Sequence, residues 1–380
     1  MPLPTPTHAD QIHSQKLSDL IRQKMAEYHG KIPFSQFMQL ALYAPELGYY
    51  NSTFEKIGKK GDFITAPEIS PLFAKCIAAQ CRSILKEIPG GDFLELGAGS
   101  GRFAQVFLET LAENGPLPKH YYILEISKNL RERQKKLLAE KCPQLFSRIQ
   151  WLEKLPENFQ GIIFANEVLD AMPVECFKIE NGIHERWVSW KNNQFCWTLT
   201  HPVTPHLFDK IAAFHLEEGY ESEINLGLAP WIKNIADNLK EGVFLIFDYG
   251  YGQREYYHPD RAIGTLMCHY QHHRHADPLI LPGLQDITAH VDFTMVAEQA
   301  TEAGLQVSGY TTQASFLMAA GLSNLITENH PPLEKYRENQ AIKRLILPSE
   351  MGEIIKVMAL TQDFSLPLQG FSLHDRRRDL

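Results

Sequence analysis

The sequence predicts an α/β fold: a mostly parallel sheet with helices on both faces. Three observations lead to this prediction. Short apolar strands alternate with helices through the middle of the chain, which is the pattern of a parallel sheet covered on both sides. A glycine-rich turn follows one of these strands, and an acidic residue ends the next. The 380 residues, 44% of them hydrophobic, can bury a full core without disulfides.

The N-terminal part of the chain is expected to be mainly helical. Apolar residues at helical spacing over 15–42 predict two short helices, broken near Gly30 and Pro33. Residues 43–60 are rich in glycine, proline and aromatic residues and indicate a loop. A helix is expected over 71–86, because proline favours a first turn and Pro-Gly-Gly follows its end.

The middle of the chain contains the alternating elements. We expect strands at 92–96, 121–125, 149–152 and 161–165, and helices at 102–113 and 128–140. Residues 176–199 then alternate apolar and polar around Asn181-Gly182 and Asn192-Asn193, which are hairpin turn signals. This segment is expected to form an antiparallel excursion, and its apolar face over 175–200 is a candidate surface for a homodimer.

The remaining elements return the chain to the sheet. A helix is expected over 229–239 and a strand over 243–247. The polar, histidine-rich stretch 249–290 is too long to be only a connecting loop, so we expect it to have a function. A helix over 293–303, strands over 305–310 and 354–360, and a frayed tail over 374–379 complete the chain.

Composition and charge exclude several classes of protein. Lys plus Arg is 37 and Asp plus Glu is 45, a net charge of −8 that argues against a general nucleic-acid binder. Six scattered cysteines form no Cys-x-x-Cys pair, so we expect buried thiols in a reducing compartment. The sequence shows neither a secretory signal nor an apolar run of about 20 residues. We therefore expect a cytoplasmic protein without membrane insertion.

The glycine turn is the strongest functional signal. The run Glu95-Leu96-Gly97-Ala98-Gly99-Ser100-Gly101 lets a ligand approach the backbone closely. A dinucleotide fingerprint would need glycine at position 102, where this chain has Arg102. The next strand ends in Glu125, whose carboxylate can accept hydrogen bonds from two ribose hydroxyls. Together these residues predict a nucleoside bound without a pyrophosphate, which suits S-adenosylmethionine (SAM).

A second polar loop follows the fourth strand, from Ala165 to Val174. Asn166, Glu167 and Asp170 are expected at the carboxyl edge of the sheet, where open α/β folds bind ligands. Helix capping by Asn166, with acidic residues in the first turn, is the structural alternative. A cap and a site can share one loop, so both interpretations stay open.

Four separated motifs resemble the MidA-like methyltransferase family. They are Gly61–Ser70, the glycine turn, Asn166-Glu167 through Pro173-Val174, and Asp286–Phe293. The resemblance covers about residues 43–360 and implies a class I methyltransferase sheet, Rossmann-like, with added N-terminal helices and an inserted substrate region. The family has a mitochondrial member, a complex I assembly factor that dimethylates an arginine. A protein arginine methyltransferase with SAM as cofactor is therefore implied here.

The resemblance also implies roles for individual residues. Cofactor contacts are expected from the glycine turn, the two acidic residues at strands and the segment that covers the cofactor: Gly97, Ala98, Gly99, Gly101, Glu95, Glu125, Thr65, Pro67 and Glu68. Asn166, Glu167 and Asp170 would face the methyl group, and Tyr270, His275, His290 and Asp292 would contact substrate. Met267 and Cys268 stand where the family usually carries an arginine.

The sequence also allows other interpretations: a metal site, an adenine-stacking tryptophan and other functions. Five histidines, at 269, 272, 273, 275 and 290, suggest a metal, but no ligand set has familiar spacing, so we expect no metal site. Trp151 is expected either to stack on adenine or to pack in the core. Three functions stay open: a protein arginine methyltransferase, a small-molecule methyltransferase, and a non-catalytic SAM-binding assembly factor.

The predicted organisation has five parts. These are an N-terminal helical region with the cofactor-covering loop at 1–90, the SAM-binding core at 91–175, the antiparallel insertion at 176–228, the rest of the core at 229–360 with a substrate loop at 249–290, and a tail at 361–380.

Overall fold

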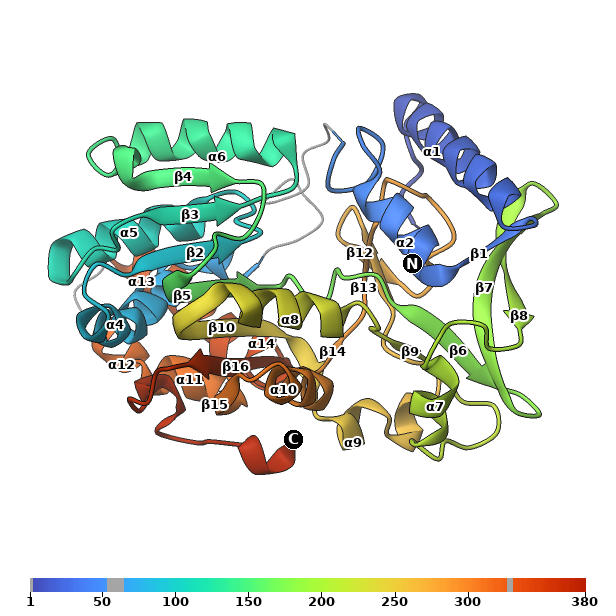
Figure 1. The fold of residues 1–380 in the computed structure, drawn as a ribbon. Coiled ribbons are helices and arrows are strands. Elements are labelled where there is room, and N and C mark those ends of the chain that lie inside the picture. Colours follow the sequence, from blue (N-terminus) through green and yellow to red (C-terminus); the bar gives the residue numbers. More distant parts are fainter. Residues whose placement is uncertain (1–2, 53–64, 327–330) are drawn as a thin grey trace. The chain divides into compact units, whose positions relative to one another are not determined.

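The computed structural model describes residues 3–52, 65–326 and 331–380, which form two compact units (Figure 1). The first, here called the sheet unit, comprises the described residues within Ile64–Leu169, Ala229–Gly252 and Val291–Leu380. The second, here called the hairpin unit, comprises those within Met1–Phe63, Asp170–Leu228 and Gln253–His290. Each unit therefore joins segments that are far apart in the sequence.

The sheet unit is built on an eight-stranded sheet in the order β15-β16-β10-β5-β2-β3-β4, with β14 beside β10. From β10 through β5, β2 and β3 to β4 the neighbours are parallel, whereas β16 is antiparallel to β10 and β15. The prediction of a mostly parallel sheet is confirmed. The strands are β2 (Asp92–Leu96), β3 (Tyr121–Leu124), β4 (Ile149–Leu152), β5 (Phe159–Asn166), β10 (Leu239–Tyr251), β14 (Val291–Asp292), β15 (Gln306–Thr312) and β16 (Ile355–Gln362).

Helices lie along and around this sheet. They are α3 (Ala66–Ile69), α4 (Pro71–Glu87), α5 (Arg102–Asn114), α6 (Lys128–Lys141), α8 (Leu228–Asn238), α10 (Phe293–Glu302), α11 (Gln313–Ala319), α12 (Leu322–Leu325), α13 (Pro332–Ile346) and α14 (Met351–Ile354). Short 3₁₀ turns occur at Phe146–Arg148, Gln369–Phe371 and Arg377–Asp379. The helices α11 to α14 were not predicted from the sequence.

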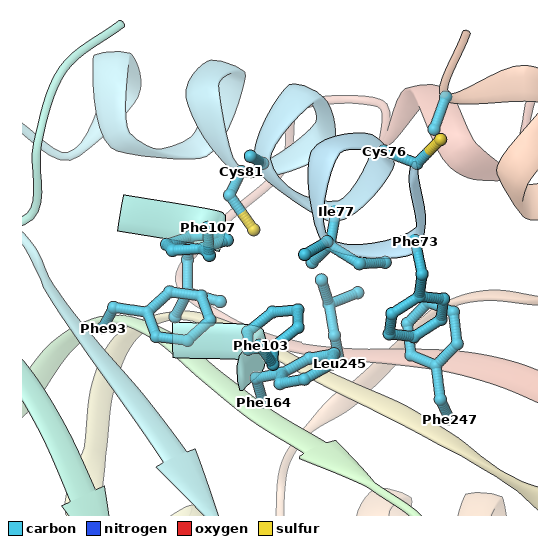
Figure 2. Packing of buried hydrophobic residues seen from close by; sticks show 14 of the residues in the cluster. Phe73, Cys76, Ile77, Cys81, Phe93, Phe103, Phe107, Phe164, Leu245 and Phe247 are labelled. Carbon is cyan, nitrogen blue, oxygen red and sulfur yellow. The ribbon is translucent and has the colours of Figure 1, made fainter. Parts of the chain in front are cut away.

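Helix α4 illustrates how the core forms. Its N-cap Ser70 accepts a hydrogen bond from the backbone N–H of Leu72, and Pro71 opens the first turn. Its apolar face lies against the aromatic side chains of the sheet and of α5 (Figure 2). The ring centroids of Phe73 and Phe247 are 5.4 Å apart. Burying one such side chain contributes about 1.5–3 kcal/mol, so this face anchors α4 on the sheet.

Strand β10 shows that both faces of the sheet are covered. Val243, Leu245 and Phe247 belong to the cluster beneath α4. The alternate residue Phe244 is also fully buried, and its ring lies 5.7 Å from that of Trp231 on α8. Because successive strand side chains point to opposite faces, α8 covers the face opposite α4.

The C-terminal residues differ from the expected frayed tail. Phe364, Leu368 and Phe371 are buried in the core cluster beneath α4. The guanidinium of Arg376 donates to Glu353 at 2.6 Å and its backbone N–H donates to the carbonyl of Tyr310. The prediction of a frayed end was wrong because a charged composition does not reveal ion pairs and buried aromatics distant in sequence.

The hairpin unit contains a five-stranded sheet in the order β1-β7-β6-β9, with β8 paired to β7. The predicted antiparallel excursion is present. Asn181-Gly182 joins β6 to β7 and Asn192-Asn193 joins β7 to β8, and all four residues have positive φ. Asn192 and Asn193 form a two-residue connection whose left-handed backbone matches the twist of the strands, whereas three residues, 180–182, connect β6 to β7. The strands are β1 (Lys31–Pro33), β6 (Glu175–Ile179), β7 (Ile183–Lys191), β8 (Gln194–Thr200) and β9 (Glu221–Ile224).

Two N-terminal helices belong to the same unit as this sheet: α1 (His8–Glu27) and α2 (Phe34–Tyr43). The rings of Phe34 and Trp197 are 5.0 Å apart, and those of Phe37 and Phe195 are 5.2 Å apart. The aromatic side chains of β8 therefore pack on α2 within the unit, and a homodimer through this segment stays a prediction.

The stretch 249–290 contains a small sheet that was not predicted, in the order β12-β11-β13. Its strands are β11 (Met267–Tyr270), β12 (His273–His275) and β13 (Asp286–Thr288). The unit also contains α7 (Leu207–Ala212), α9 (Gln253–Tyr256) and a 3₁₀ turn at Pro259–Arg261. Among the described helices of the chain, none is long and apolar enough to cross a membrane.

A pair of facing glycines permits the close approach of β2, β5 and β10. Gly161 and Gly242 are neighbours in the β5–β10 ladder and have φ values of 135° and 145°. A Cβ on Gly161 would lie 2.0 Å from the carbonyl oxygen of Asp92, and one on Gly242 would lie 1.9 Å from that of Gly161. A side chain at either position therefore requires the strands to separate.

We predict that Gly242→Ala destabilises the sheet unit by roughly 3 kcal/mol or more, since overpacking and a strained φ add. Gly304→Ala is the control: its φ is also positive, at 92°, but no atom lies within 4 Å of the added Cβ. The free energy of unfolding of that variant should fall only by the cost of the strained φ, about 1–3 kcal/mol. Differential scanning calorimetry of both variants measures the difference. Equal losses would show that strand proximity does not constrain position 242.

Candidate active site

Three glycines shape the turn between β2 and α5. Gly97, Gly99 and Gly101 have φ values of 64°, 51° and 83°, a region that favours glycine. A Cβ on Gly97 would meet Cγ2 of Val168 at 3.3 Å, and one on Gly101 would meet Cγ of Gln134 at 3.3 Å. Side chains of Val168 and Gln134 therefore pack against the turn, while Gly97 itself is exposed and Gly99 is half-buried. The turn carries the chain directly into the N-terminus of α5, the kind of backbone that accommodates a nucleoside ligand.

The carboxylate predicted to hold a ribose lies one strand away. Glu125 follows β3 and is 4% exposed. Its Oε1 accepts the backbone N–H of Ser127 at 3.0 Å, and its Oε2 accepts Nε2 of Gln134 at 3.1 Å. Burial raises the pKa of Glu125, while these hydrogen bonds and Arg131 oppose that rise. Each oxygen keeps a lone pair for another donor, which fits a pair of ribose hydroxyls.

Glu95, inside β2, provides a second buried carboxyl group beside the turn. Its Oε2 accepts the hydroxyl of Tyr121 at 2.7 Å. Burial raises the pKa of Glu95 to about 8, and the charge of Glu125 adds to the rise. At neutral pH Glu95 is therefore mainly protonated, and it can donate as well as accept a hydrogen bond.

A short segment before α4 reaches the glycine turn. Thr65 is the N-cap of α3, and Pro67 and Glu68 lie in its single turn. The hydroxyl of Ser100 donates to Oε1 of Glu68. Thr65, Pro67 and Glu68 thus lie in the sheet unit with the glycine turn. The first four residues of this motif, Gly61 to Ile64, lie outside the described residues.

The loop after β5 places Asn166 and Glu167 beside the same turn. Glu167 has φ 53°, a left-handed conformation that is uncommon for a residue with a side chain. Its backbone N–H donates to the carbonyl of Phe247 at 2.8 Å. Val168 follows directly, and its side chain is the one that a Cβ on Gly97 would meet. The loop and the glycine turn are therefore in contact.

Asp248, on the neighbouring strand β10, holds this loop in place. Asp248 is fully buried, and its Oδ2 accepts the backbone N–H groups of Val168 at 3.1 Å and Leu169 at 2.8 Å. Its Oδ1 accepts the N–H of Tyr249 at 2.8 Å. The N–H groups of residues 167, 168 and 169 thus all bond to Phe247 or Asp248 of β10. These bonds hold Glu167 in its strained conformation.

The capping alternative for Asn166 is wrong. No helix follows β5, because residues 167–174 form bends and turns before β6 begins. Nδ2 of Asn166 donates to Oε1 of Glu167 at 3.2 Å. Within the described part of the chain, the buried Oδ1 of Asn166 has no hydrogen-bond partner, so it can accept a hydrogen bond from a ligand.

The other predicted residues have different surroundings. Asp170 begins the hairpin unit, where it is buried and its carbonyl accepts the N–H of Ala289 at 2.9 Å. The N–H of His290 donates to Oγ1 of Thr265 at 2.8 Å. Asp292 is the N-cap of α10 in the sheet unit and accepts the N–H groups of Thr294 and Met295. Its observed role is therefore capping, and a substrate role stays a prediction.

Tyr270 and His275 lie on the two strands of one hairpin, β11 and β12. The hydroxyl of Tyr270 accepts Nε2 of Gln271 at 3.1 Å, and Tyr270 is buried. Burial lowers the pKa of His275, and burial also lowers the pKa of His269 to about 4. Among the described residues, no group of three His, Cys, Asp or Glu side chains is arranged to hold a metal.

Three residues of the site were missed by sequence reasoning: Gln134, Asp248 and Tyr121. Asp248 carried a signal, because it directly follows the apolar run 243–247 at a strand's carboxyl end. Gln134 and Tyr121 carried none, since a glutamine in a helix and a tyrosine in a strand are ordinary at those positions. Trp151 packs partly against the core cluster beneath α4, and its indole N–H donates to Oε1 of Gln134 at 2.9 Å.

We predict that Glu95 makes the sheet unit less stable as pH rises. The unfolded pKa is near 4.5 and the folded pKa about 8, so the folded state binds more protons between these values. Stability contributed by Glu95 is therefore full below pH 4.5 and is lost as pH rises to 8, by up to about 1.4 kcal/mol per pH unit. Glu95→Gln, which stays neutral, should remove this loss in ligand-free protein. Parallel pH profiles of unfolding for both proteins would contradict the assignment.

Comparison with known proteins agrees with this geometry. The sequence model of a family of S-adenosyl-L-methionine-dependent methyltransferases, Methyltransf_28, matches residues 76–311, more than half of the chain. A Burkholderia thailandensis protein solved with S-adenosyl-homocysteine bound is 37% identical, with a TM-score of 0.96 over 100% of both chains. The sheet, the glycine turn and the enclosed carboxylates therefore occur in a fold that holds this nucleoside.

Curated relatives point to the same family. Protein arginine methyltransferase NDUFAF7 of Danio rerio is 28% identical, covering 85% of this chain and 82% of the relative. The human protein of that name is 27% identical, covering 87% and 80%.

These relatives are named mitochondrial, which contradicts the cytoplasmic location expected from the sequence. That expectation was based on missing secretory and membrane signals, and such signals do not distinguish the cytosol from the mitochondrion. The family match and the relative with bound S-adenosyl-homocysteine identify the chemistry itself. The chain belongs to the MidA-like family of SAM-dependent methyltransferases, and it is an enzyme whose cofactor is SAM.

Proposed function

We propose that the enzyme transfers methyl groups from SAM to an arginine side chain of a protein substrate. Two observations support the arginine acceptor. The curated relatives are named protein arginine methyltransferases. The loop after β5 also presents a carboxylate, Glu167, in a fixed and strained conformation beside the cofactor turn. The second observation carries the proposal, because a carboxylate held in one conformation beside the glycine turn can bind a cationic acceptor, and strained residues often cluster at functional sites.

The chemistry of arginine requires such a carboxylate. SAM supplies a methyl group that is bound to a positively charged sulfur. The acceptor nitrogen attacks the methyl carbon in line with the carbon–sulfur bond, and the sulfur is the leaving group. A guanidinium has a pKa above about 12 and stays protonated in water. Glu167 would hold this cation by charge-assisted hydrogen bonds and orient one nitrogen toward the methyl group. As the nitrogen–carbon bond forms and the carbon–sulfur bond breaks, this nitrogen would release one proton to the carboxylate of Glu167. Asn166 would accept a further N–H through its buried Oδ1.

The same geometry supports the cofactor contacts that we propose. Gly97, Ala98, Gly99 and Gly101 would line the cofactor with backbone, and Glu125 would accept its ribose hydroxyls. Glu95 would lie beside the turn in its protonated form. Thr65, Pro67 and Glu68 would cover the cofactor from α3. Asp170 is the second carboxylate predicted from the sequence, and with Tyr270, His275 and His290 it stays a prediction about substrate contacts.

Glu167→Gln tests the acceptor role directly. Methyl transfer should fall roughly 100-fold or more, because the amide cannot neutralise a guanidinium. The dissociation constant for S-adenosyl-homocysteine should change by less than about threefold, a limit set by the ordinary loss of one neutral contact. Glu132→Gln is the control, since Glu132 is exposed on α6 and pairs with Lys135. Unchanged turnover in Glu167→Gln would exclude Glu167 as the acceptor's partner.

The acceptor itself is identified by labelling. Methyl-tritiated SAM and the purified enzyme are added to a lysate of a strain lacking the gene, and labelled proteins are hydrolysed for amino-acid analysis. Labelled methylarginine in a protein band supports the proposal. Label confined to small molecules would instead favour a small-molecule methyltransferase, and label on another amino acid would exclude arginine.

Asp248→Asn tests whether the loop must be held rigidly. The amide group would direct N–H toward backbone N–H donors, so the variant should lose about 1–3 kcal/mol of stability. Methyl transfer should fall at least tenfold while S-adenosyl-homocysteine binding stays nearly constant, because Glu167 loses its support but the glycine turn does not. Asp237→Asn, an exposed site on α8 paired with Lys233, is the control. Equal turnover in the two variants would contradict this positioning role.

A further inference from the structure

Gln134 stands out as a fully buried polar side chain in the middle of the cofactor site. It lies on α6, away from the residues that the sequence motifs identify. Its Nε2 donates to the carbonyl of Gly99 at 2.9 Å and to Oε2 of Glu125 at 3.1 Å. Its Oε1 accepts the indole N–H of Trp151 at 2.9 Å. One amide therefore connects the glycine turn, the acidic end of β3 and the tryptophan of β4.

The chemistry of the amide suits this position closely. A glutamine has two N–H donors and one carbonyl acceptor, and each is used here. Glutamate would lack both donors and would add a second carboxylate beside Glu125. Methionine has a similar shape but can make none of these bonds. Because all partners are buried or partly buried, losing the amide would leave several polar groups unsatisfied.

Gln134 also sets the distance between α6 and the turn. Its Cγ is the nearest atom to a Cβ added at Gly101, at 3.3 Å, and its Cα lies at 3.4 Å. The side chain thus packs on the turn with its stem and binds it with its amide. These contacts fix the position of α6 relative to the glycine turn.

We propose that Gln134 is a positioning residue that orients Glu125 toward the ribose of SAM and thereby sets the ribose selectivity of the site. This rests on the proposed assignment of Glu125 to the ribose hydroxyls. With Ser127 N–H on Oε1 and Gln134 on Oε2, the carboxylate cannot rotate, and its remaining lone pairs have fixed directions. The hydrogen bond from Gln134 also lowers the pKa of Glu125 against the effect of burial, which favours the accepting, ionised form.

The test compares ligands with and without ribose hydroxyls. Isothermal titration calorimetry measures S-adenosyl-homocysteine and its 2′-deoxy and 3′-deoxy analogues on the intact protein. The native enzyme should bind the full nucleoside at least tenfold more tightly than either analogue. Gln134→Met should weaken the binding of S-adenosyl-homocysteine at least tenfold and the binding of the two analogues by less. The ratio of the dissociation constants of analogue and full nucleoside should therefore fall toward one. Gln105→Met on α5, where the amide bonds only to Glu109 among the contacts described for it, should keep the native preference.

The outcomes separate this inference from the ribose assignment. If Gln134→Met weakens all three ligands equally, or weakens none, Gln134 does not act through Glu125 and the inference is overturned. If Glu125→Gln keeps the full preference for ribose hydroxyls, the ribose assignment fails instead. Should Gln134→Met not fold, Trp151→Phe removes the single N–H that holds the amide carbonyl. That variant should reduce the hydroxyl preference severalfold, and an unchanged preference would overturn the inference.

Discussion

The parallel pairing of β5 with both β2 and β10 is the interaction on which the rest of the site depends. This register puts Leu96 opposite Ala165 and Phe247 opposite Asn166. β2 ends at Leu96 and β5 at Asn166, level with Phe247 of β10, and β10 itself continues to Tyr251. The glycine turn, the Glu167 loop and Asp248 therefore lie next to one another at this edge of the sheet. Two facing glycines, Gly161 and Gly242, let the backbones pack this closely. Parallel strands place their carboxyl ends on one edge, so one register assembles residues from three distant segments.

At this edge, local strain and long-range hydrogen bonds are coupled. Glu167 would not hold φ 53° by itself, because the left-handed region is unfavourable for most side chains. The bonds from three consecutive N–H groups to Phe247 and Asp248 of β10 stabilise the conformation. The cost at Glu167 is thus offset by a buried carboxylate eighty residues later in the chain. The Glu167 loop owes its geometry to tertiary contacts rather than to its own sequence.

Sequence patterns predicted what local physics determines. The strand-turn-helix at Gly97, the acidic end of β3 and both asparagine hairpin turns follow from backbone preference and hydrophobic periodicity. The helices α11, α12 and α14 and the strands within 249–290 were missed because they are too short to show an apolar period. Helix α13 has 15 residues but buries only Ile342 and Leu345 among its described residues, so its sequence shows little apolar periodicity. The position of Gln134 beside the glycine turn could not be predicted from the sequence, for a different reason. Its amide matters through three partners at distant positions, and a single sequence does not show which residues meet.

Glu95 and Glu125, the two buried carboxyl groups near the glycine turn, differ in the hydrogen-bond donors and charges around them. Burial alone does not explain their properties. Both gain a raised pKa from desolvation. Glu125 receives two N–H donors and lies near Arg131, which favours its ionised form. Glu95 receives one hydroxyl and the repulsion of Glu125, so its pKa reaches about 8. The hydrogen-bond donors around Glu125 therefore support the proposal that it accepts ribose hydroxyls. The raised pKa of Glu95 keeps that group mainly neutral, which limits the negative charge beside the glycine turn.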